Sequence, residues 1–250
     1  MTAAVYPDRR TLYVESARRI EQLIANALQT RERAAICLTG GDTARDVYAA
    51  IATNERQTPR IEWGRLELFW GDERDVPPNH PDSNYGMAAT ALLNHVPVNP
   101  AFVHRIPAEG HDADTAARAY AMTLRQTVFA SRTGYAFDLM LLGVGADAHI
   151  ASLFPGAAEL GTPADRQVVA VPAAKNRGRR ITLTPEVILD ARLILMMVSG
   201  SDKADAVHAA FSLPEDVTRW PAQILRRAGD RVEWLMDSAA AARVPAVRRA

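Results

Sequence analysis

The chain has 250 residues, of which 48% are hydrophobic and 23% are charged, and its 29 lysine and arginine residues balance 29 aspartate and glutamate residues. This composition is typical of a folded globular protein and excludes the disordered and fibrous classes. A balanced charge gives no general attraction to nucleic acid or to an anionic membrane. We therefore expect neither as a partner, and any anion site must be local.

The beginning of the chain carries charged residues before any apolar stretch that is long enough for a signal peptide. No later apolar run approaches the roughly 20 residues that span a bilayer. A cytoplasmic location is therefore predicted. The single cysteine, Cys37, lies in an apolar run and is expected to be buried, and one cysteine forms neither an internal disulfide nor a metal cluster.

Apolar residues at helical spacing predict a helix over residues 14–27, and a short apolar run before two glycines predicts a buried strand at 34–38. The pattern recurs, with helices predicted at 43–53, 83–93, 112–130 and 202–210 and strands at 66–70, 138–142 and 193–198. Apolar strands that alternate with amphipathic helices predict an α/β fold: a doubly wound, mostly parallel sheet with helices on both faces.

Three segments are less regular. Residues 231–236 alternate polar with apolar side chains, which predicts a half-exposed strand at the margin of the sheet. Residues 163–180 contain prolines and many basic residues and are predicted to form a loop, and the alanine-rich end, 239–250, is predicted to be a solvated helix or a frayed tail. The chain has no internal repeat and no low-complexity linker, so residues 1–250 are expected to form a single domain.

In doubly wound sheets, ligands bind beyond the carboxyl ends of the strands. Residues that follow the apolar runs therefore have the first claim to a site. The run 34–38 is followed by Gly40, Gly41 and Thr43, which lead into a helix. Glycines allow a close approach of the backbone, and the N–H groups at a helix start bind phosphate. The alternative is a tight turn in which Asp42 or Thr43 caps the helix.

Two charged residues follow the strand at 66–70. Asp72 and Arg74 lie at the strand's carboxyl end, where charges are placed to orient a ligand or a catalytic partner. The polar residues 79–86 are interpreted as turn residues in which Asp82 or Ser83 caps the next helix.

The strand at 138–142 ends in a glycine turn that leads to Asp147 and His149. Histidine can take a proton from water near neutral pH, and a nearby carboxylate can orient the ring and stabilise its charged form. We therefore predict that His149 is a general base.

Basic residues form the fourth candidate element. Lys175, Arg177, Arg179 and Arg180 precede an apolar segment, and Lys203 follows the strand at 193–198. Arg180 and Lys203 each border a predicted strand, so this pair is predicted to hold a phosphate group, as one guanidinium fork and one ammonium charge can. The other basic residues are expected to be solvated.

In this order, the segments resemble the 6-phosphogluconolactonase family over nearly the whole chain, from about Leu38 to Asp237. The motifs that carry the resemblance are WGDER at 70–74, HPDSNYG at 80–86, FDLMLLGVGADAHIASLFPG at 137–156, RITLT at 180–184 and WPAQIL at 220–225. The resemblance implies a fold like that of glucosamine-6-phosphate deaminase and ribose-5-phosphate isomerase. It also implies hydrolysis of 6-phospho-D-glucono-1,5-lactone to 6-phosphogluconate in the oxidative pentose phosphate pathway, without a metal or an organic cofactor.

Carried over by position, the resemblance makes His149 the general base, with Asp147 in its motif. It makes Asp72 and Arg74 the ligand-orienting pair, and it assigns the phosphate group to Thr43, Arg180 and Lys203. The expected reaction begins when the histidine deprotonates a water that attacks the lactone carbonyl, and the protonated ring then assists departure of the ring oxygen. Backbone N–H groups of the 143–148 turn and the Arg74 guanidinium are both candidates for stabilising the oxyanion.

The sequence departs from the family pattern at two positions. Ala148 stands where the family has glycine before its histidine, and a positive φ there would strain the turn by roughly 1 kcal/mol and displace His149. Asp42 stands where the family's first glycine loop usually has serine. Its carboxylate either caps the helix or weakens phosphate binding by repulsion.

Three alternatives follow. The nearest is a glucosamine-6-phosphate deaminase, which shares the sheet and the histidine turn, but this chain lacks the Asn-Glu-Pro-Gly continuation and the Asp-Glu-Tyr motif of those enzymes. A sugar-phosphate sensor fused to a DNA-binding module has no room in this length. The third is a binding-only protein that is degenerate at Ala148 and Asp42. The assembly is expected to be a monomer or a small homo-oligomer.

Overall fold

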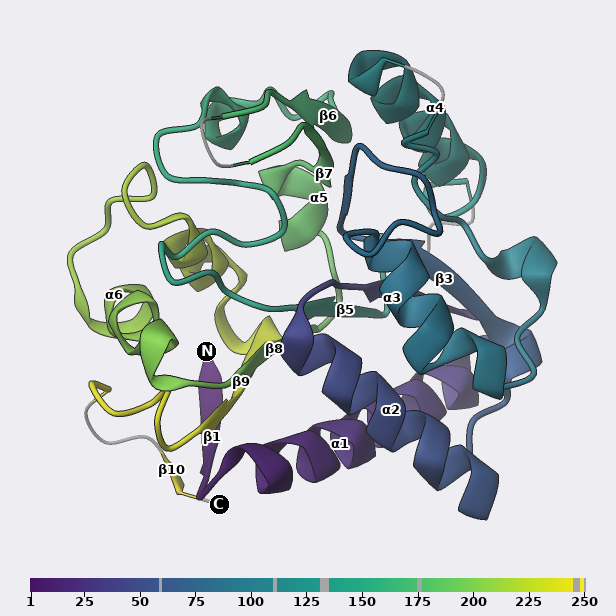
Figure 1. Cartoon of the computed structure of the whole chain (residues 1–250), viewed down its shortest axis with the longest axis horizontal. Coiled ribbons are helices and arrows are strands. Elements are labelled where there is room, and N and C mark those ends of the chain that lie inside the picture. The colour runs from purple at the N-terminus through teal and green to yellow at the C-terminus, as the bar shows by residue number, and fades with distance from the viewer. Residues whose placement is uncertain (59, 110–111, 131–134, 175–176, 245–247, 250) are drawn as a thin grey trace.

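The computed structural model describes residues 1–58, 60–109, 112–130, 135–174, 177–244 and 248–249. Its main sheet has seven strands in the order β10-β1-β9-β8-β5-β2-β3, and every neighbouring pair runs parallel (Figure 1). The strands are β1 (Thr2–Tyr6), β2 (Ala34–Leu38), β3 (Leu66–Trp70), β5 (Leu139–Leu142), β8 (Ile194–Val198), β9 (Val232–Asp237) and β10 (Arg248–Arg249).

The α-helices are α1 (Arg9–Thr30), α2 (Asp42–Gln57), α3 (Asn84–Ala91), α4 (Ala113–Gln126), α5 (Pro185–Leu189) and α6 (Ala204–Ser212). Short 3₁₀ segments are η1 (Trp63–Arg65), η2 (Leu93–His95), η3 (Pro100–Phe102), η4 (Ala158–Gly161), η5 (Ser201–Lys203) and η6 (Pro221–Arg231). The predicted helices and the four apolar strands are confirmed. None of the described helices is long and apolar enough to cross a membrane.

Helices cover both faces of the main sheet. Neighbouring residues of a strand point to opposite faces. On β9, Glu233 forms an ion pair of 2.8 Å with Arg19 of α1, whereas the next residue, Trp234, packs edge-on against Phe211 of α6. Helices α1 and α6 therefore lie on opposite faces, and α2 lies alongside α1 (Figure 1). The predicted doubly wound architecture is confirmed.

The predicted position of β9 is wrong. This strand lies between β1 and β8, not at the margin of the sheet. Its alternating pattern misled because Glu233, its polar residue, is neutralised by Arg19 beneath α1. From the sequence alone, a charged residue that is paired beneath a helix cannot be distinguished from one that is exposed to water.

A second sheet of three antiparallel strands stands beyond the carboxyl end of β3. Its order is β4 (Asp72–Arg74), β7 (Arg180–Leu183) and β6 (Val168–Val171). The predicted loop at 163–180 is therefore wrong at 168–171, where four apolar residues are too few to stand out among prolines and basic residues. Only Gly71 separates β3 from β4, which is the arrangement of one domain, although the single domain over 1–250 stays a prediction.

The chain ends also differ from expectation. β1 was not predicted, because TAAVY has no strong apolar pattern. In the alanine-rich end, residues 248–249 form a strand that pairs with β1, so the prediction of a helix or frayed tail is wrong there; 245–247 and 250 lie outside the described residues.

Candidate active site

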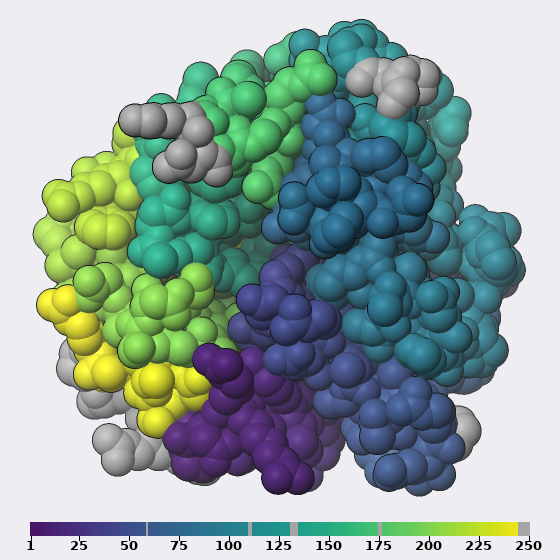
Figure 2. Space-filling view, viewed as in Figure 1, coloured from purple at the N-terminus to yellow at the C-terminus, as the bar shows by residue number. Residues whose placement is uncertain are grey.

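A cleft of about 500 Å³ opens at the carboxyl ends of β2, β5 and β8. Figure 2 shows it as a hollow in the middle of this face, between the dark-blue, teal and green segments. The sequence-predicted residues that line it are Gly40, Gly41, Thr43, Asp72, Arg74, His149, Arg180 and Lys203. The ninth, Asp147, contacts the cleft through His149.

The place of the cleft follows from the strand order. From β2 the chain crosses to β3 on one side, and from β5 it crosses to β8 on the other. Connections that diverge in this way leave a crevice between the two strand ends, which is where doubly wound sheets bind ligands. The loops after β2 and β5 are the two glycine turns of the sequence, and both reach the cleft.

His149 and Asp147 form an acid–base pair. The Nδ1 atom of His149 lies 2.5 Å from Oδ1 of Asp147, and the same oxygen accepts a hydrogen bond of 3.2 Å from the His149 backbone. Partial burial acts to raise the pKa of Asp147, but the hydrogen bonds and charge of His149 outweigh it and hold that pKa below its ordinary value. An ionised Asp147 fixes the proton on Nδ1, so Nε2 is the nitrogen left to accept one.

The turn that carries this pair is built around Gly145. A Cβ atom on Gly145 would overlap the His149 ring and the Asp147 carboxylate, so no larger residue fits. The Gly145 N–H donates to the His149 carbonyl at 2.9 Å, and the Ala148 carbonyl accepts a hydrogen bond of 2.9 Å from Ala222 of η6. The WPAQIL motif at 220–225 therefore anchors the turn that carries His149.

Ala148 has a φ of 68° and is fully buried. The left-handed conformation that favours glycine is thus present at this position, as the sequence comparison anticipated. The His149–Asp147 hydrogen bond nevertheless forms with alanine in place. The structure accommodates the strain in the backbone without separating the two side chains.

We expect Ala148→Gly to raise the free energy of unfolding by up to about 1 kcal/mol, because relief of the left-handed strain exceeds the added entropy of the unfolded chain. Urea denaturation measures this. Ala146→Gly is the matched control, since Ala146 has no positive φ and lies in the same turn. The control should lower the stability slightly, and equal effects of the two variants would contradict the strain at Ala148.

Asp72 is held by two side chains that sequence reasoning did not select. Ser152 Oγ donates to Asp72 Oδ2 at 2.6 Å, and Asn84 Nδ2 donates to Oδ1 at 3.1 Å and to the Asp72 carbonyl at 2.9 Å. A Cβ atom on Gly40 would overlap the Asn84 amide. Gly40 is thus required to seat Asn84, whereas a close approach of its backbone to a ligand stays a prediction. Both Ser152 and Asn84 stand in the quoted motifs, which was the available signal.

Arg74 and Arg180 lie side by side. They are paired in register across β4 and β7, and the Nε atoms of both are buried without a hydrogen-bond partner among the described residues. Arg74 Nη1 donates to the Asp82 carbonyl at 2.5 Å. Burial and the adjacent Arg74 charge lower the pKa of Arg180. Two neighbouring guanidiniums with unused donors favour an anionic ligand, because buried donors are normally satisfied.

The start of α2 also lines the cleft. Gly41, with a φ of 96°, is its N-cap and offers no side-chain hydrogen bond, so the alternative in which Asp42 or Thr43 caps this helix is wrong. Asp42 instead pairs with Arg45 at 2.6 Å, which offsets its charge toward a bound anion. Lys203 lines the same cleft, and its Nζ atom is 3.0 Å from Asp202.

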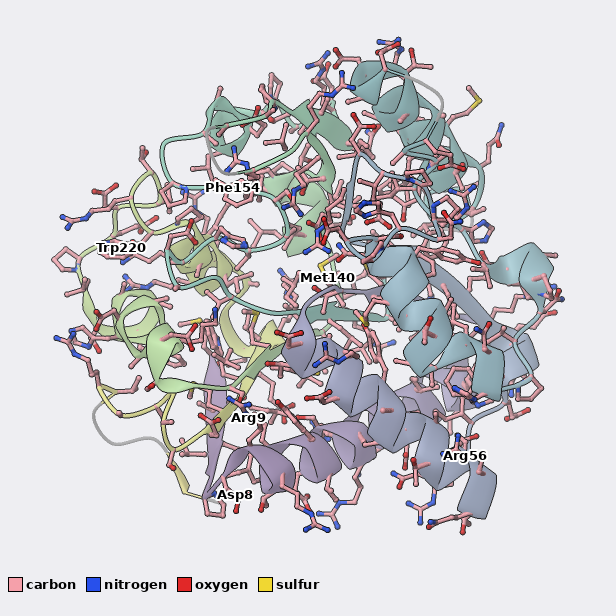
Figure 3. The ribbon with its side chains drawn as sticks, viewed as in Figure 1. Asp8, Arg9, Arg56, Met140, Phe154 and Trp220 are labelled. Carbon is pink, nitrogen blue, oxygen red and sulfur yellow. The ribbon has the colours of Figure 1, made fainter. Side chains whose placement is uncertain are left out.

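The remaining basic residues differ in their exposure to solvent. Arg179 is exposed and pairs with Asp75 at 2.7 Å, as expected for a solvated residue. Arg177 is half-buried and lies 3.5 Å from the centroid of Phe154, whose ring packs 4.6 Å from that of His149, so the expectation of a solvated Arg177 is wrong. Phe154 is labelled in Figure 3. Lys175 lies outside the described residues.

Arg9, Tyr13 and Ser199 also line the cleft and were missed. Arg9 begins α1, directly beyond β1. Had β1 been predicted, the rule that assigns ligands to strand ends would have selected this residue too. In the part of the chain that the structure describes, no group of three or more histidine, cysteine, aspartate or glutamate side chains is arranged to hold a metal ion.

The fold and the cleft define an α/β protein with a His–Asp pair and two neighbouring arginines at the carboxyl edge of a parallel sheet. The family model described as Glucosamine-6-phosphate isomerases/6-phosphogluconolactonase matches residues 7–234. The chain belongs to this family.

Individual relatives agree with this assignment. The 6-phosphogluconolactonase of Mycobacterium leprae is 36% identical over 250 residues, which cover 96% of this chain and 97% of that protein. The structure of 6-phosphogluconolactonase from Trypanosoma brucei has a TM-score of 0.79 at 26% identity and covers 97% of this chain and 98% of its own. The structure of a monomeric glucosamine-6-phosphate deaminase has a TM-score of 0.80 at 20% identity and covers 97% of this chain and 100% of its own. This similarity shows that the fold is shared.

Proposed function

We propose that this protein hydrolyses 6-phospho-D-glucono-1,5-lactone to 6-phospho-D-gluconate in the oxidative pentose phosphate pathway. The observation that carries the proposal is one cleft in which a His–Asp pair and two arginines with unused donors meet. The pair supplies the base for hydrolysis, and the cations suit a phosphorylated substrate. The names of the relatives support the same reaction.

In the proposed reaction, Nε2 of His149 takes a proton from a water molecule while the water oxygen bonds to the lactone carbonyl carbon. Asp147 stabilises the imidazolium that forms. The tetrahedral intermediate then collapses, the bond from this carbon to the ring oxygen breaks, and the imidazolium returns the proton to that oxygen. The product is the open-chain acid, which ionises in water.

Arg74 and the N–H groups of Gly143 and Val144, which also line the cleft, are the candidates for stabilising the oxyanion. Within the 143–148 turn, the Gly145 and Ala148 N–H groups already donate to backbone carbonyls, and the His149 N–H donates to Asp147. The guanidinium of Arg74 retains an Nε donor with no partner among the described residues. A preorganised donor of this kind stabilises charge that develops in the transition state.

The decay of freshly prepared lactone, followed with and without the protein, tests the proposal. We expect decay well above the rate in buffer. Decay at the buffer rate, together with a rise in melting temperature on adding 6-phosphogluconate, would instead identify a binding-only protein. A cytoplasmic location, a monomeric or small homo-oligomeric state and the absence of a cofactor stay predictions.

Arg180→Gln should raise KM for the phosphorylated lactone by about 10- to 100-fold, because a charge-assisted hydrogen bond contributes roughly 1.5–3 kcal/mol. Steady-state kinetics measure this effect. Arg179→Gln is the matched control, since Arg179 is the exposed neighbour that pairs with Asp75. If the two variants had the same KM, Arg180 would not bind the substrate.

A further inference from the structure

Helix α1 contributes two side chains to the wall of the cleft. Arg9 and Tyr13 both line it, and they lie one helical turn apart. Neither belongs to a motif that carries the family resemblance. In Figure 3, Arg9 lies at the start of α1 and Phe154 in the loop after β5, below and above β8 in this view. Arg9 and the histidine turn thus reach the cleft from different elements, α1 and the loop after β5.

A buried relay holds Arg9. Its Nε atom donates to Ser199 Oγ at 3.1 Å, and Ser199 Oγ donates to Asp237 Oδ2 at 2.6 Å. Asp237 is buried and is itself fixed by the backbone N–H groups of Gly200 and Ala240, at 3.1 Å and 2.8 Å. The relay uses one donor of the guanidinium and sets its direction. The Nη1 and Nη2 groups have no hydrogen-bond or ion-pair partner among the described residues.

The other basic residues near Arg9 are paired with carboxylates, whereas Arg9 is not. Arg45 is paired with Asp42 at 2.6 Å and with Asp46 at 3.2 Å, and Lys203 is paired with Asp202 at 3.0 Å. In each of these pairs the carboxylate offsets the charge of the basic side chain. Arg9 reaches a carboxylate only through the neutral hydroxyl of Ser199. The Nη1 and Nη2 groups of Arg9 are therefore hydrogen-bond donors that contact no carboxylate in the described part of the chain.

We infer that Arg9 binds the phosphate group of the substrate together with Lys203 and the N-terminus of α2, and that it thereby selects phosphorylated over unphosphorylated lactones. The inference rests on the proposed function. A planar guanidinium tethered through Nε presents Nη1 and Nη2 as a fork, the geometry that binds phosphate oxygens in pairs. Because the group lies away from the His149–Asp147 pair, its effect falls on binding.

The test compares Arg9→Gln, Arg9→Lys and the matched control Arg10→Gln, whose arginine is exposed like Arg9 but does not line the cleft. We expect Arg9→Gln to raise KM for 6-phospho-D-glucono-1,5-lactone about tenfold and to leave kcat within about threefold. Turnover of unphosphorylated D-glucono-1,5-lactone should not change. Arg9→Lys should be intermediate, because it keeps the charge but loses the fork.

Ser199→Ala separates orientation from charge, because it removes the tether and keeps the arginine. It should raise KM for the phosphorylated lactone by a smaller factor than Arg9→Gln. The inference is overturned if Arg9→Gln behaves like Arg10→Gln, or if it impairs both lactones equally.

A titration with inorganic phosphate, followed by melting temperature, keeps this test independent of catalysis. Phosphate should stabilise wild type and Arg10→Gln alike and Arg9→Gln less. A wild type that hydrolyses neither lactone but shows this difference would reject the proposed function and retain the phosphate site. Equal stabilisation of all three proteins, or none of any, would reject the role of Arg9.

Discussion

Replacing His149 with alanine should lower kcat for lactone hydrolysis about a thousandfold, because it removes the one histidine that lines the cleft among the described residues, whose Nε2 atom can take a proton from water. KM should change little, since the phosphate contacts remain. Initial rates corrected for spontaneous hydrolysis measure both constants. His95→Ala is the matched control: this histidine is exposed and bonds to the Thr90 carbonyl, away from the cleft.

Asp147→Asn refines the same prediction. The amide keeps the size of the side chain but no longer offsets the charge of the imidazolium, so kcat should fall about a hundredfold. Initial rates of the variant, corrected for spontaneous hydrolysis, measure this loss. An unchanged kcat would show that the charge of Asp147 does not act through the ring.

Asp147 also links activity to stability. Its pKa in the folded protein lies below the ordinary value because of His149, although partial burial opposes the shift. A carboxylate with a lowered folded pKa contributes stability above its unfolded pKa and loses it as the pH falls through the folded value. Acid should therefore weaken the turn that holds His149.

Glu73→Ala should lower the free energy of unfolding by about 3 kcal/mol, the largest single loss of stability we expect in the site. Glu73 is 3% exposed and accepts hydrogen bonds from Ser83 Oγ and from the backbone N–H groups of Arg74, Asn84 and Tyr85, at 2.7–3.0 Å. Without the carboxylate these buried donors lose their partner. Urea denaturation of the variant gives the value.

The environment of Glu73 explains why glutamine cannot replace it. Burial raises the pKa of Glu73 even though four hydrogen bonds act in the opposite direction. A glutamine amide would aim two donors at groups that are themselves donors, so Glu73→Gln should also lose stability, by about 1–2 kcal/mol. Glu62→Ala, at an exposed carboxylate that pairs with Arg65, should leave stability unchanged. If Glu73→Ala left the free energy of unfolding unchanged, Glu73 would not stabilise the start of α3 through these hydrogen bonds.

The parts of the site that the sequence predicted are local or periodic. His149 and Asp147 are two residues apart, so the motif that names them also brings them together. The strands at 34–38, 66–70, 138–142 and 193–198 are apolar on both faces and recognisable one at a time. Their carboxyl ends then place Asp72, Thr43 and Lys203 at one edge.

The parts that escaped prediction depend on contacts between distant residues. Arg9 is directed by Ser199, 190 positions away, and Glu233 looks exposed until Arg19 of α1 is placed beside it. Position 40 must be glycine because a side chain there would overlap Asn84, and no local pattern indicates this contact. A single sequence carries the propensity of each segment, whereas partners across the sheet are fixed only by packing.

The insertion of β9 between β1 and β8 bears on how the protein is made. In the sheet, β1 has β9 and β10 as its neighbours, so the first strand to leave the ribosome has no partner until residues 232–237 have been synthesised. Helix α1 and the strands from β2 to β8 can assemble earlier, while the segment before Asp8 waits unpaired. The contact from Arg9 through Ser199 to Asp237 therefore forms only after the end of β9 has been synthesised.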